Sequence, residues 1–208
     1  MIKKNSLVDG IGNKKITENY YDNWSGYYEK TLNRWNYQAP KKCVNILAQK
    51  IKLKPERILD LACGTGFFGE EMIKRFSSVK IDGSDISIKS LNLARKKNIY
   101  RKLIKKSFES NHNSKNYYDI VSMIGSMTYC KKHDRLFELV FSYLTHNGYF
   151  IFTQRIDLWN KFKLYTVLEN FSEKFKIIYK SKPINYLPNN KDFSKKIKIY
   201  IVLLKKFK

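Results

Sequence analysis

Glycines cluster directly behind a short apolar run of the sequence. The run covers residues 58–62, and Gly64, Gly66 and Gly69 follow it. Glycine tolerates a positive φ and a close approach of backbone to ligand, and the start of a helix offers free N–H groups. The stretch therefore predicts a strand, a glycine turn and a helix that together receive the polar or anionic end of a ligand.

One carboxylate follows this turn at an informative distance. Asp85 stands nineteen residues beyond Gly66, at the expected end of the next strand. A carboxylate in this position accepts hydrogen bonds from both hydroxyls of a ribose. The two features together predict a site for an adenosine-containing cofactor.

The same glycines fit two classes of cofactor site. Their G-x-G-x-x-G spacing is also that of dinucleotide-binding domains, so a NAD-type oxidoreductase is one alternative. Against it, Asp60 stands four residues before the first glycine, and a long segment precedes the first strand. The Tyr-x-x-x-Lys pattern of short-chain dehydrogenases has one match, Tyr37 to Lys41, which lies in front of the loop and contains Pro40. We keep the oxidoreductase as the less favoured hypothesis.

Apolar runs and amphipathic stretches alternate along the chain from residue 57 onward. Such alternation with short connections is typical of a mostly parallel sheet covered by helices on both faces. Two final runs, 175–180 and 197–204, predict an antiparallel strand pair at the sheet edge. The predicted fold class is thus α/β, with a doubly wound, mostly parallel, seven-stranded Rossmann-like sheet. The earlier strands are expected over 58–62, 79–82, 100–104, 119–124 and 149–153, and helices over 40–50, from 67, over 87–97 and over 134–144.

Length and composition limit the class of protein. The chain has 208 residues, 43% of them hydrophobic, which suits one folded domain. Residues 1–18 are polar and predict a flexible tail in front of a domain over 19–208. Cys43, Cys63 and Cys130 lack paired spacing, so no metal site is expected. The lack of a long apolar run predicts a cytoplasmic location without membrane insertion.

The net charge of +23 raises the question of a nucleic-acid partner, because clustered cations gain affinity by releasing counterions from phosphates. Most of the basic residues are lysines spread from Lys3 to Lys208, and arginine, the preferred reader of phosphates and bases, is scarce. We therefore interpret the charge as a solvated surface and keep nucleic acid as an alternative partner.

The glycine loop and the strand that follows it resemble a known family. Asp60 to Gly66 resembles the first motif of class I S-adenosylmethionine-dependent methyltransferases, with Ala62 where many members have glycine. Asp85-Ile86-Ser87 resembles their second-strand acidic motif, and the resemblance extends over about residues 20–155. It implies S-adenosylmethionine as the cofactor.

The amino-terminal part carries a narrower resemblance. Tyr21-Asp22-x-Trp24-Ser25-x-x-Tyr28, followed by Tyr37-x-Ala39-Pro40, is similar to methyltransferase-like proteins related to the Williams-Beuren syndrome region product. This implies an amino-terminal helical lid in which Tyr21, Trp24 and Tyr28 close the cofactor pocket. An aromatic cluster at this spacing is equally typical of core packing. The implied divisions are a lid over 19–54, a cofactor-binding core over 57–155 and a substrate-side region with the closing strands over 156–208.

The family resemblance also implies roles for single residues. The backbone from Gly64 to Gly66 would approach the methionine portion of the cofactor, Asp60 would support its amino group and Asp85 would hold the ribose. Ile86 and Phe108 would flank the adenine, although the acidic residue that the family often has beside Phe108 is missing from its usual place. The predicted cofactor-binding residues are Tyr21, Trp24, Tyr28, Asp60, Ala62, Cys63, Gly64, Gly66, Asp85, Ile86, Phe108 and Gly125.

The acceptor is expected beside the end of the fourth strand, where Gly125 and Ser126 would meet the sulfonium. A sulfonium is already an activated methyl donor, so alignment of the acceptor and exclusion of water carry most of an in-line displacement. A general base is optional, and no catalytic residue is assigned. The candidates are Tyr129, His133 and Arg155.

A small molecule is the favoured acceptor, because the chain shows no separate recognition domain. Gly125-Ser126-Met127-Thr128 stands where enzymes that methylate amino groups of nucleic-acid bases carry an Asp/Asn-Pro-Pro-aromatic motif. An RNA-associated methyltransferase using the basic surface and a non-catalytic cofactor-binding protein stay open as alternatives. The oligomeric state is not predicted.

Overall fold

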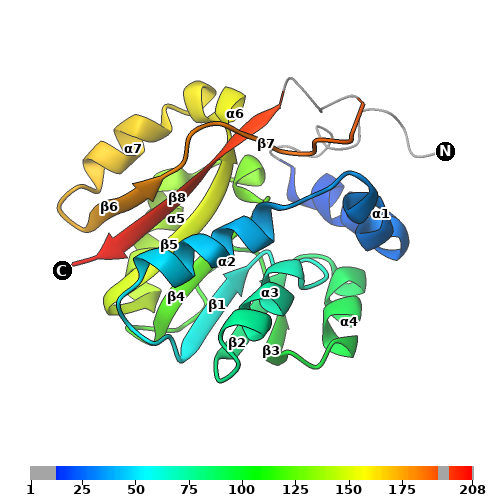
Figure 1. Cartoon of the computed structure of the whole chain (residues 1–208), viewed down its shortest axis with the longest axis horizontal. Coiled ribbons are helices and arrows are strands. Elements are labelled where there is room, and N and C mark those ends of the chain that lie inside the picture. Colours follow the sequence, from blue (N-terminus) through cyan, green and yellow to red (C-terminus); the bar gives the residue numbers. More distant parts are fainter. Residues whose placement is uncertain (1–12, 192–196, 208) are drawn as a thin grey trace.

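The computed structural model describes residues 13–191 and 197–207 as one sheet with helices on both faces (Figure 1). The strand order is β3-β2-β1-β4-β5-β8-β6, and β7 pairs with β8 beside this path. The strands are β1 (Arg57–Leu61), β2 (Lys80–Asp85), β3 (Tyr100–Lys105), β4 (Tyr118–Met123), β5 (Leu144–Arg155), β6 (Phe175–Lys180), β7 (Ile184–Asn185) and β8 (Lys198–Lys206).

Two helices precede β1, and the others lie in the connections that follow β1, β2, β4 and β5. The helices are α1 (Lys14–Arg34), α2 (Ala39–Lys50), α3 (Phe67–Arg75), α4 (Ile88–Lys96), α5 (His133–Tyr143), α6 (Ile156–Lys161), α7 (Leu164–Asn170) and the short 3-10 helix η1 (Met127–Tyr129). In the described part of the chain, no helix combines the length and the apolar character that crossing a membrane requires.

The predicted fold class is confirmed, with one added strand. β1 pairs in parallel with β2 and β4, and the parallel pairing continues to β3 and β5. β8 runs antiparallel to β5 and β6, as expected for the closing pair. The sheet has eight strands instead of seven because the two-residue β7 pairs with the start of β8. Such a short strand leaves no periodic pattern to detect.

Two other predicted boundaries are wrong. The tail was expected to extend to residue 18, but α1 begins at Lys14, where the Asn13 side chain accepts a hydrogen bond from the Ile16 N–H at 3.1 Å and caps the helix. Residues 1–12 lie outside the described residues. The fifth strand was expected to begin at residue 149, but β5 begins at Leu144, and Asn147 within it has a φ of 64°.

Alternate residues of the central strands β1, β4 and β5 supply two separate cores. Ile58, Ile120 and Ile151 face α2 and α3, which lie on the viewer's side of the sheet in Figure 1. Their neighbours in sequence face α5 and α7 on the other side. Both faces of the central strands are therefore buried, and the open positions for a ligand lie at the strand ends.

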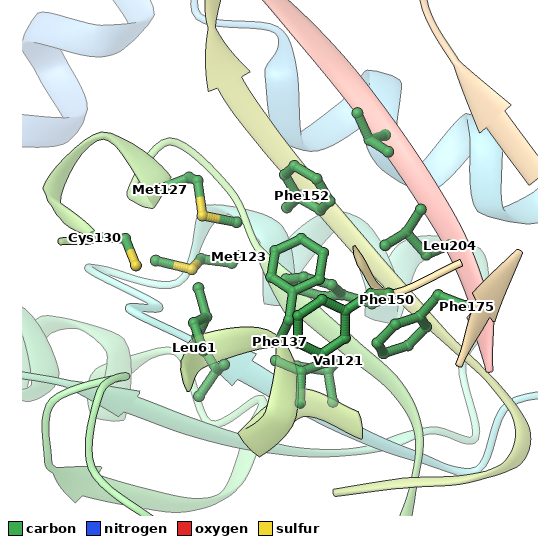
Figure 2. Close-up of a cluster of buried hydrophobic side chains, with 14 of the residues drawn as sticks. Leu61, Val121, Met123, Met127, Cys130, Phe137, Phe150, Phe152, Phe175 and Leu204 are labelled. Carbon is green, nitrogen blue, oxygen red and sulfur yellow. The ribbon is translucent and has the colours of Figure 1, made fainter. Parts of the chain in front are cut away.

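Phe137 of α5 occupies the centre of the second core. Its ring lies 5.6 Å from that of Phe150, 5.8 Å from that of Phe152 and 6.2 Å from that of Phe175, between helix and sheet (Figure 2). This core fixes β4 and β5 against α5, and with them the segment that follows β4.

Replacing Phe137 by Ala leaves a buried cavity, and we expect it to lower the free energy of unfolding by about 3–5 kcal/mol. Urea unfolding followed by circular dichroism measures the change. Tyr165→Ala is the control, because this side chain is 50% exposed, and it should cost less than about 0.5 kcal/mol. Equal losses in the two variants would contradict the assignment of Phe137 to the core centre.

Candidate functional site

The glycine loop follows β1 and needs unusual backbone angles. Gly64 and Gly66 have φ of 55° and 97°, and Gly66 is the residue that precedes α3. Ala62 also has a positive φ, 54°, which costs an L-residue about 1–2 kcal/mol. The conformation explains why glycine suits the Ala62 position, and it turns the chain sharply from strand to helix.

Asp85, the last residue of β2, binds this loop through hydrogen bonds. Its Oδ2 accepts the Gly64 N–H at 2.9 Å, and its Oδ1 accepts the Ser87 N–H at 2.8 Å. Burial raises the pKa of this carboxyl, while the backbone N–H groups of Ser87, Gly64 and Ile86 oppose that rise. Each oxygen keeps a second lone-pair direction. Asp85 can therefore fix the loop and still accept hydrogen bonds from a ligand.

A cavity of about 250 Å³ opens beside Asp85 at the carboxyl ends of β1, β2 and β4, and α1 covers it. It brings together most of the predicted site. The predicted residues that line it are Tyr21, Tyr28, Ala62, Gly64, Asp85, Ile86, Phe108, Gly125, Ser126 and Tyr129.

A second, smaller pocket of about 30 Å³ adjoins the first and shares Tyr28, Ala62 and Gly64 with it. Asp60 and Cys63 line this pocket and not the larger one. Thr65 also lines it, and its fully buried Oγ1 has no hydrogen-bond partner among the described residues. An unsatisfied buried hydroxyl is costly, so this pocket suits a polar group of a ligand.

Asp60 is held by two side chains that the sequence did not point to. Its Oδ1 accepts the Ser122 Oγ–H at 2.7 Å, and its Oδ2 accepts the Tyr100 O–H at 2.8 Å. Burial raises the pKa of Asp60 to about 7, against the lowering effect of these hydrogen bonds. The contact with Ser122 could have been predicted, because Ser122 lies opposite Asp60 in the neighbouring parallel strand β4. Tyr100 lies at the start of β3 and reaches Asp60 across β2, which no local pattern predicts.

Trp24 and Gly66 line neither pocket. The Trp24 ring is buried and packs at 4.7 Å from Tyr28 and 5.9 Å from Trp35. Core packing is thus its observed role, whereas the helix turns Tyr21 and Tyr28 toward the cavity. The expectation that Trp24 closes the pocket directly is corrected accordingly.

The catalytic candidates are placed differently from one another. Tyr129 lines the cavity, and its hydroxyl lies 3.0 Å from that of Tyr21. His133 is buried against Phe162, at 5.1 Å between rings, and does not line the cavity. Arg155 also lies outside the lining and donates two hydrogen bonds to Asp157, at 3.1 and 2.7 Å.

Gly125 makes room for two tyrosines from distant segments. A Cβ at this position would lie 2.7 Å from the Tyr37 hydroxyl and 3.4 Å from that of Tyr186, and its φ is 80°. The two rings meet edge to face at 5.6 Å. Tyr186 follows β7, far along the chain, and no sequence signal connects it to the site. The wall of the site behind Gly125 is therefore built by tertiary contacts.

The lid helix α1 is fixed to the core by an acidic stripe. Glu18 pairs with Lys105 at 2.7 Å, and Glu29 pairs with Lys97 at 2.6 Å. Between them, Asp22 accepts the Ser87 Oγ–H at 2.5 Å. These three residues lie on one face of the helix. Because Ser87 also donates to Asp85, the lid is tied to the residue that holds the glycine loop.

The chain is similar to known methyltransferases. Residues 58–148 match a family model described as a methyltransferase domain. The chain is 27% identical over 152 residues to malonyl-[acyl-carrier protein] O-methyltransferase 1 of Ilyobacter polytropus, covering 69% of this chain and 53% of that protein. It is 31% identical over 86 residues to human methyltransferase-like protein 27, covering 40% of this chain and 35% of that protein. The chain thus spans about half, or less, of the curated relatives that it matches.

Solved structures agree in fold. The plantazolicin methyltransferase BpumL, in complex with a monoazolic desmethylPZN analog and SAH, has a TM-score of 0.67 at 14% identity, covering 98% of this chain and 95% of that one. A putative S-adenosylmethionine-dependent methyltransferase from Listeria monocytogenes has a TM-score of 0.62 at 16% identity, covering 80% of this chain and 98% of that one. The family match and these relatives thus show that the chain is similar to methyltransferases over residues 58–148, and the solved structures show that it shares their fold.

We expect Asp22→Ala to loosen the lid, because the variant removes the acceptor that Ser87 uses. Tryptic cleavage in α1, at Lys14, Lys15 or Lys30, should accelerate about fivefold, the equivalent of one hydrogen bond. Mass spectrometry of timed digests measures the rate. Asn23→Ala, which changes the exposed neighbour, serves as the control. Equal cleavage rates in the two variants would show that Asp22 does not hold the helix.

The raised pKa of Asp60 predicts a pH dependence of stability. An aspartate with a pKa of about 7 when folded and about 4 when unfolded binds more protons in the folded state. The free energy of unfolding should therefore fall as the pH rises from about 4 to about 7. Asp60→Asn should flatten this slope, while Asp134→Asn, at an exposed position, should keep it. Urea unfolding at several pH values measures both, and an unchanged slope in Asp60→Asn would refute the assignment.

Proposed function

We propose that this protein transfers the methyl group of S-adenosylmethionine to a small-molecule or peptide acceptor by direct in-line displacement. The observation that carries the proposal is the position of Asp85, which ends β2 in the wall of the cavity and fixes the glycine loop through Gly64. The relatives named above, which include methyltransferases of a carrier-protein-bound acid and of plantazolicin, support an acceptor of this range.

The residues present fit the cofactor part by part. Ile86 and Phe108 line the same cavity as Asp85 and would flank the adenine, while Asp85 would accept the ribose hydroxyls. The smaller pocket would take the methionine portion, where Thr65 Oγ1 lacks a partner and Asp60 lies ready to face an ammonium group. The smaller pocket is lined mostly by polar groups, whereas the larger cavity is mostly apolar with Asp85 in its wall, which suits an adenine ring and its ribose.

When bound, the cofactor supplies an activated methyl group on a sulfonium. The chain's own task is to align the acceptor beside Gly125, Ser126 and Tyr129 and to keep water out. α1 excludes water, because its Tyr21 and Tyr28 line the cavity. The ion pairs of its acidic stripe keep the helix against the core. Tyr129 is the residue among the three catalytic candidates whose position supports contact with the acceptor.

The finer family relationship of the chain stays a prediction. The similarity to human methyltransferase-like protein 27 supports a relationship to the Williams-Beuren-related group over 86 residues only. The comparisons give no support to the oxidoreductase, the RNA-associated enzyme or the non-catalytic protein. A cytoplasmic location and the absence of a metal centre are likewise predictions.

Calorimetric titration with S-adenosylmethionine, S-adenosylhomocysteine and NADH tests the proposal. We expect binding of the two sulfur compounds at micromolar concentration and none of NADH. Asp85→Ala should weaken binding of S-adenosylhomocysteine by at least tenfold, since it removes charge-assisted hydrogen bonds to the ribose and frees the glycine loop. Asp134→Ala, at an exposed position, should bind like the natural protein.

Two outcomes of the titration would contradict the proposal. Binding of NADH alone would favour an oxidoreductase. An Asp85→Ala variant that folds and binds S-adenosylhomocysteine with unchanged affinity would show that Asp85 does not hold the ribose.

A further inference from the structure

The part of the cavity beyond Gly125 is lined by hydroxyl groups. Tyr21 comes from the lid and Tyr129 from η1, and their hydroxyl oxygens lie 3.0 Å apart. Burial raises the pKa of Tyr129 to about 12 and that of Tyr21 well above its usual value. Both groups stay protonated at neutral pH. One of the two protons lies between the oxygens, and the other is left to donate to a ligand.

A third hydroxyl lies in the same wall. Ser126 is 8% exposed and lines the cavity, and its Oγ has no hydrogen-bond partner in the described part of the chain. Burying a hydroxyl without a partner is unfavourable, so this group is available to a ligand oxygen. Ser126 and Tyr129 belong to one short turn, since the Tyr129 N–H donates to the Ser126 carbonyl at 3.0 Å.

The charges around this wall are mostly positive. Lys14, Lys106 and Lys131 line the same cavity, and the charge of buried Arg155 acts on Tyr129. The acidic residues of the lining are Asp85 and Glu109. Asp85 already accepts two backbone N–H groups.

Glu109 follows Phe108 and accepts the Lys131 N–H at 3.3 Å. The excess of positive charge around the cavity would repel a cationic amine and attract an anion.

No histidine of the described residues lines the cavity, so no imidazole there can act as a general base toward the acceptor. An ammonium or an alcohol must lose a proton during or before methylation, whereas a carboxylate already carries its lone pair free at neutral pH. The site therefore suits an acceptor that needs no base.

We propose that the acceptor atom is a carboxylate oxygen, held by the hydroxyls of Ser126 and of the Tyr21–Tyr129 pair. The inference rests on the proposed methyltransferase function and names its substrate class. The carboxylate oxygen forms a bond to the methyl carbon while the carbon–sulfur bond breaks and its electron pair stays on sulfur. The anion and the sulfonium become a neutral methyl ester and a neutral thioether, and no proton is transferred.

The test follows the chemical form of the transferred methyl group. The full chain is incubated with methyl-labelled S-adenosylmethionine and one of several matched probes. The small probes are hexanoate, hexanamide and hexylamine. The peptide probes are two tripeptides with a blocked amino terminus, one with a free and one with an amidated carboxyl terminus. Mild alkali releases the label of a methyl ester as volatile methanol and leaves N-methyl groups intact. We expect label on the free acids alone, released by alkali.

Three results decide between the possibilities. Alkali-labile label confined to the acids supports the inference. Alkali-stable label, or equal transfer to the amides and the amine, overturns it while leaving the methyltransferase function in place. Binding of S-adenosylmethionine without transfer to any probe counts against the carboxylate class, and failure to bind the cofactor contradicts the proposed function itself.

Two variants separate the roles of hydroxyl and charge. Tyr129→Phe should lower kcat/KM for the acid about tenfold or more, through the loss of a hydrogen bond to a charged group, with the affinity for S-adenosylhomocysteine unchanged. Lys131→Gln should raise KM about two- to fivefold at low salt and less at high salt. Lys132→Gln is the matched control, because it removes the adjacent exposed lysine, which does not line the cavity. Equal effects of the two lysine variants, or no effect of Tyr129→Phe, would contradict the assigned wall.

Discussion

The carboxylate of Asp85 is the point on which the rest of the site depends. It accepts backbone N–H groups from Gly64 and from Ser87, two segments that follow neighbouring strands. The parallel pairing of β1 with β2 continues into the turn, where the Cys63 N–H donates to the Ser84 carbonyl at 3.0 Å. One side chain thus sets the shape of the glycine loop and the start of α4 at the same time.

The lid is connected to the same point. Ser87 donates its Oγ–H to Asp22 of α1 and its N–H to Asp85, so the helix above the cavity and the carboxylate in its wall share one partner. On the opposite side, Gly125 admits the hydroxyls of Tyr37 and Tyr186, and Tyr129 meets Tyr21. The side of the cavity beside Asp85 is therefore built by sheet register, and the side beside Gly125 by aromatic side chains from distant segments.

This division explains what could be predicted from the sequence. The motif around Gly64 and the place of Asp85 follow from local strand and turn chemistry, and the apolar alternation carries the sheet. The cavity also includes Ile86, Phe108 and Gly125, which follow strand ends in the expected manner. Each of these positions depends on residues close by in sequence or on the regular order of a parallel sheet.

The features that escaped prediction depend on long-range contacts. Tyr100 reaches Asp60 across β2, and Tyr186 reaches Gly125 from a segment after β7. For Trp24, pocket closure and core packing were equally expected, and its contact with Trp35 in an aromatic cluster decides for packing. The helix start at Lys14 depends on a single capping side chain, Asn13, in an otherwise polar stretch. None of these produces a periodic signal.

The most direct test of the central claim is a crystal structure of the protein with S-adenosylhomocysteine. We expect the ribose hydroxyls within hydrogen-bond distance of Asp85, the adenine between Ile86 and Phe108, and the thioether sulfur facing Gly125. Adenosine bound elsewhere, or bound here with its ribose turned away from Asp85, would contradict it.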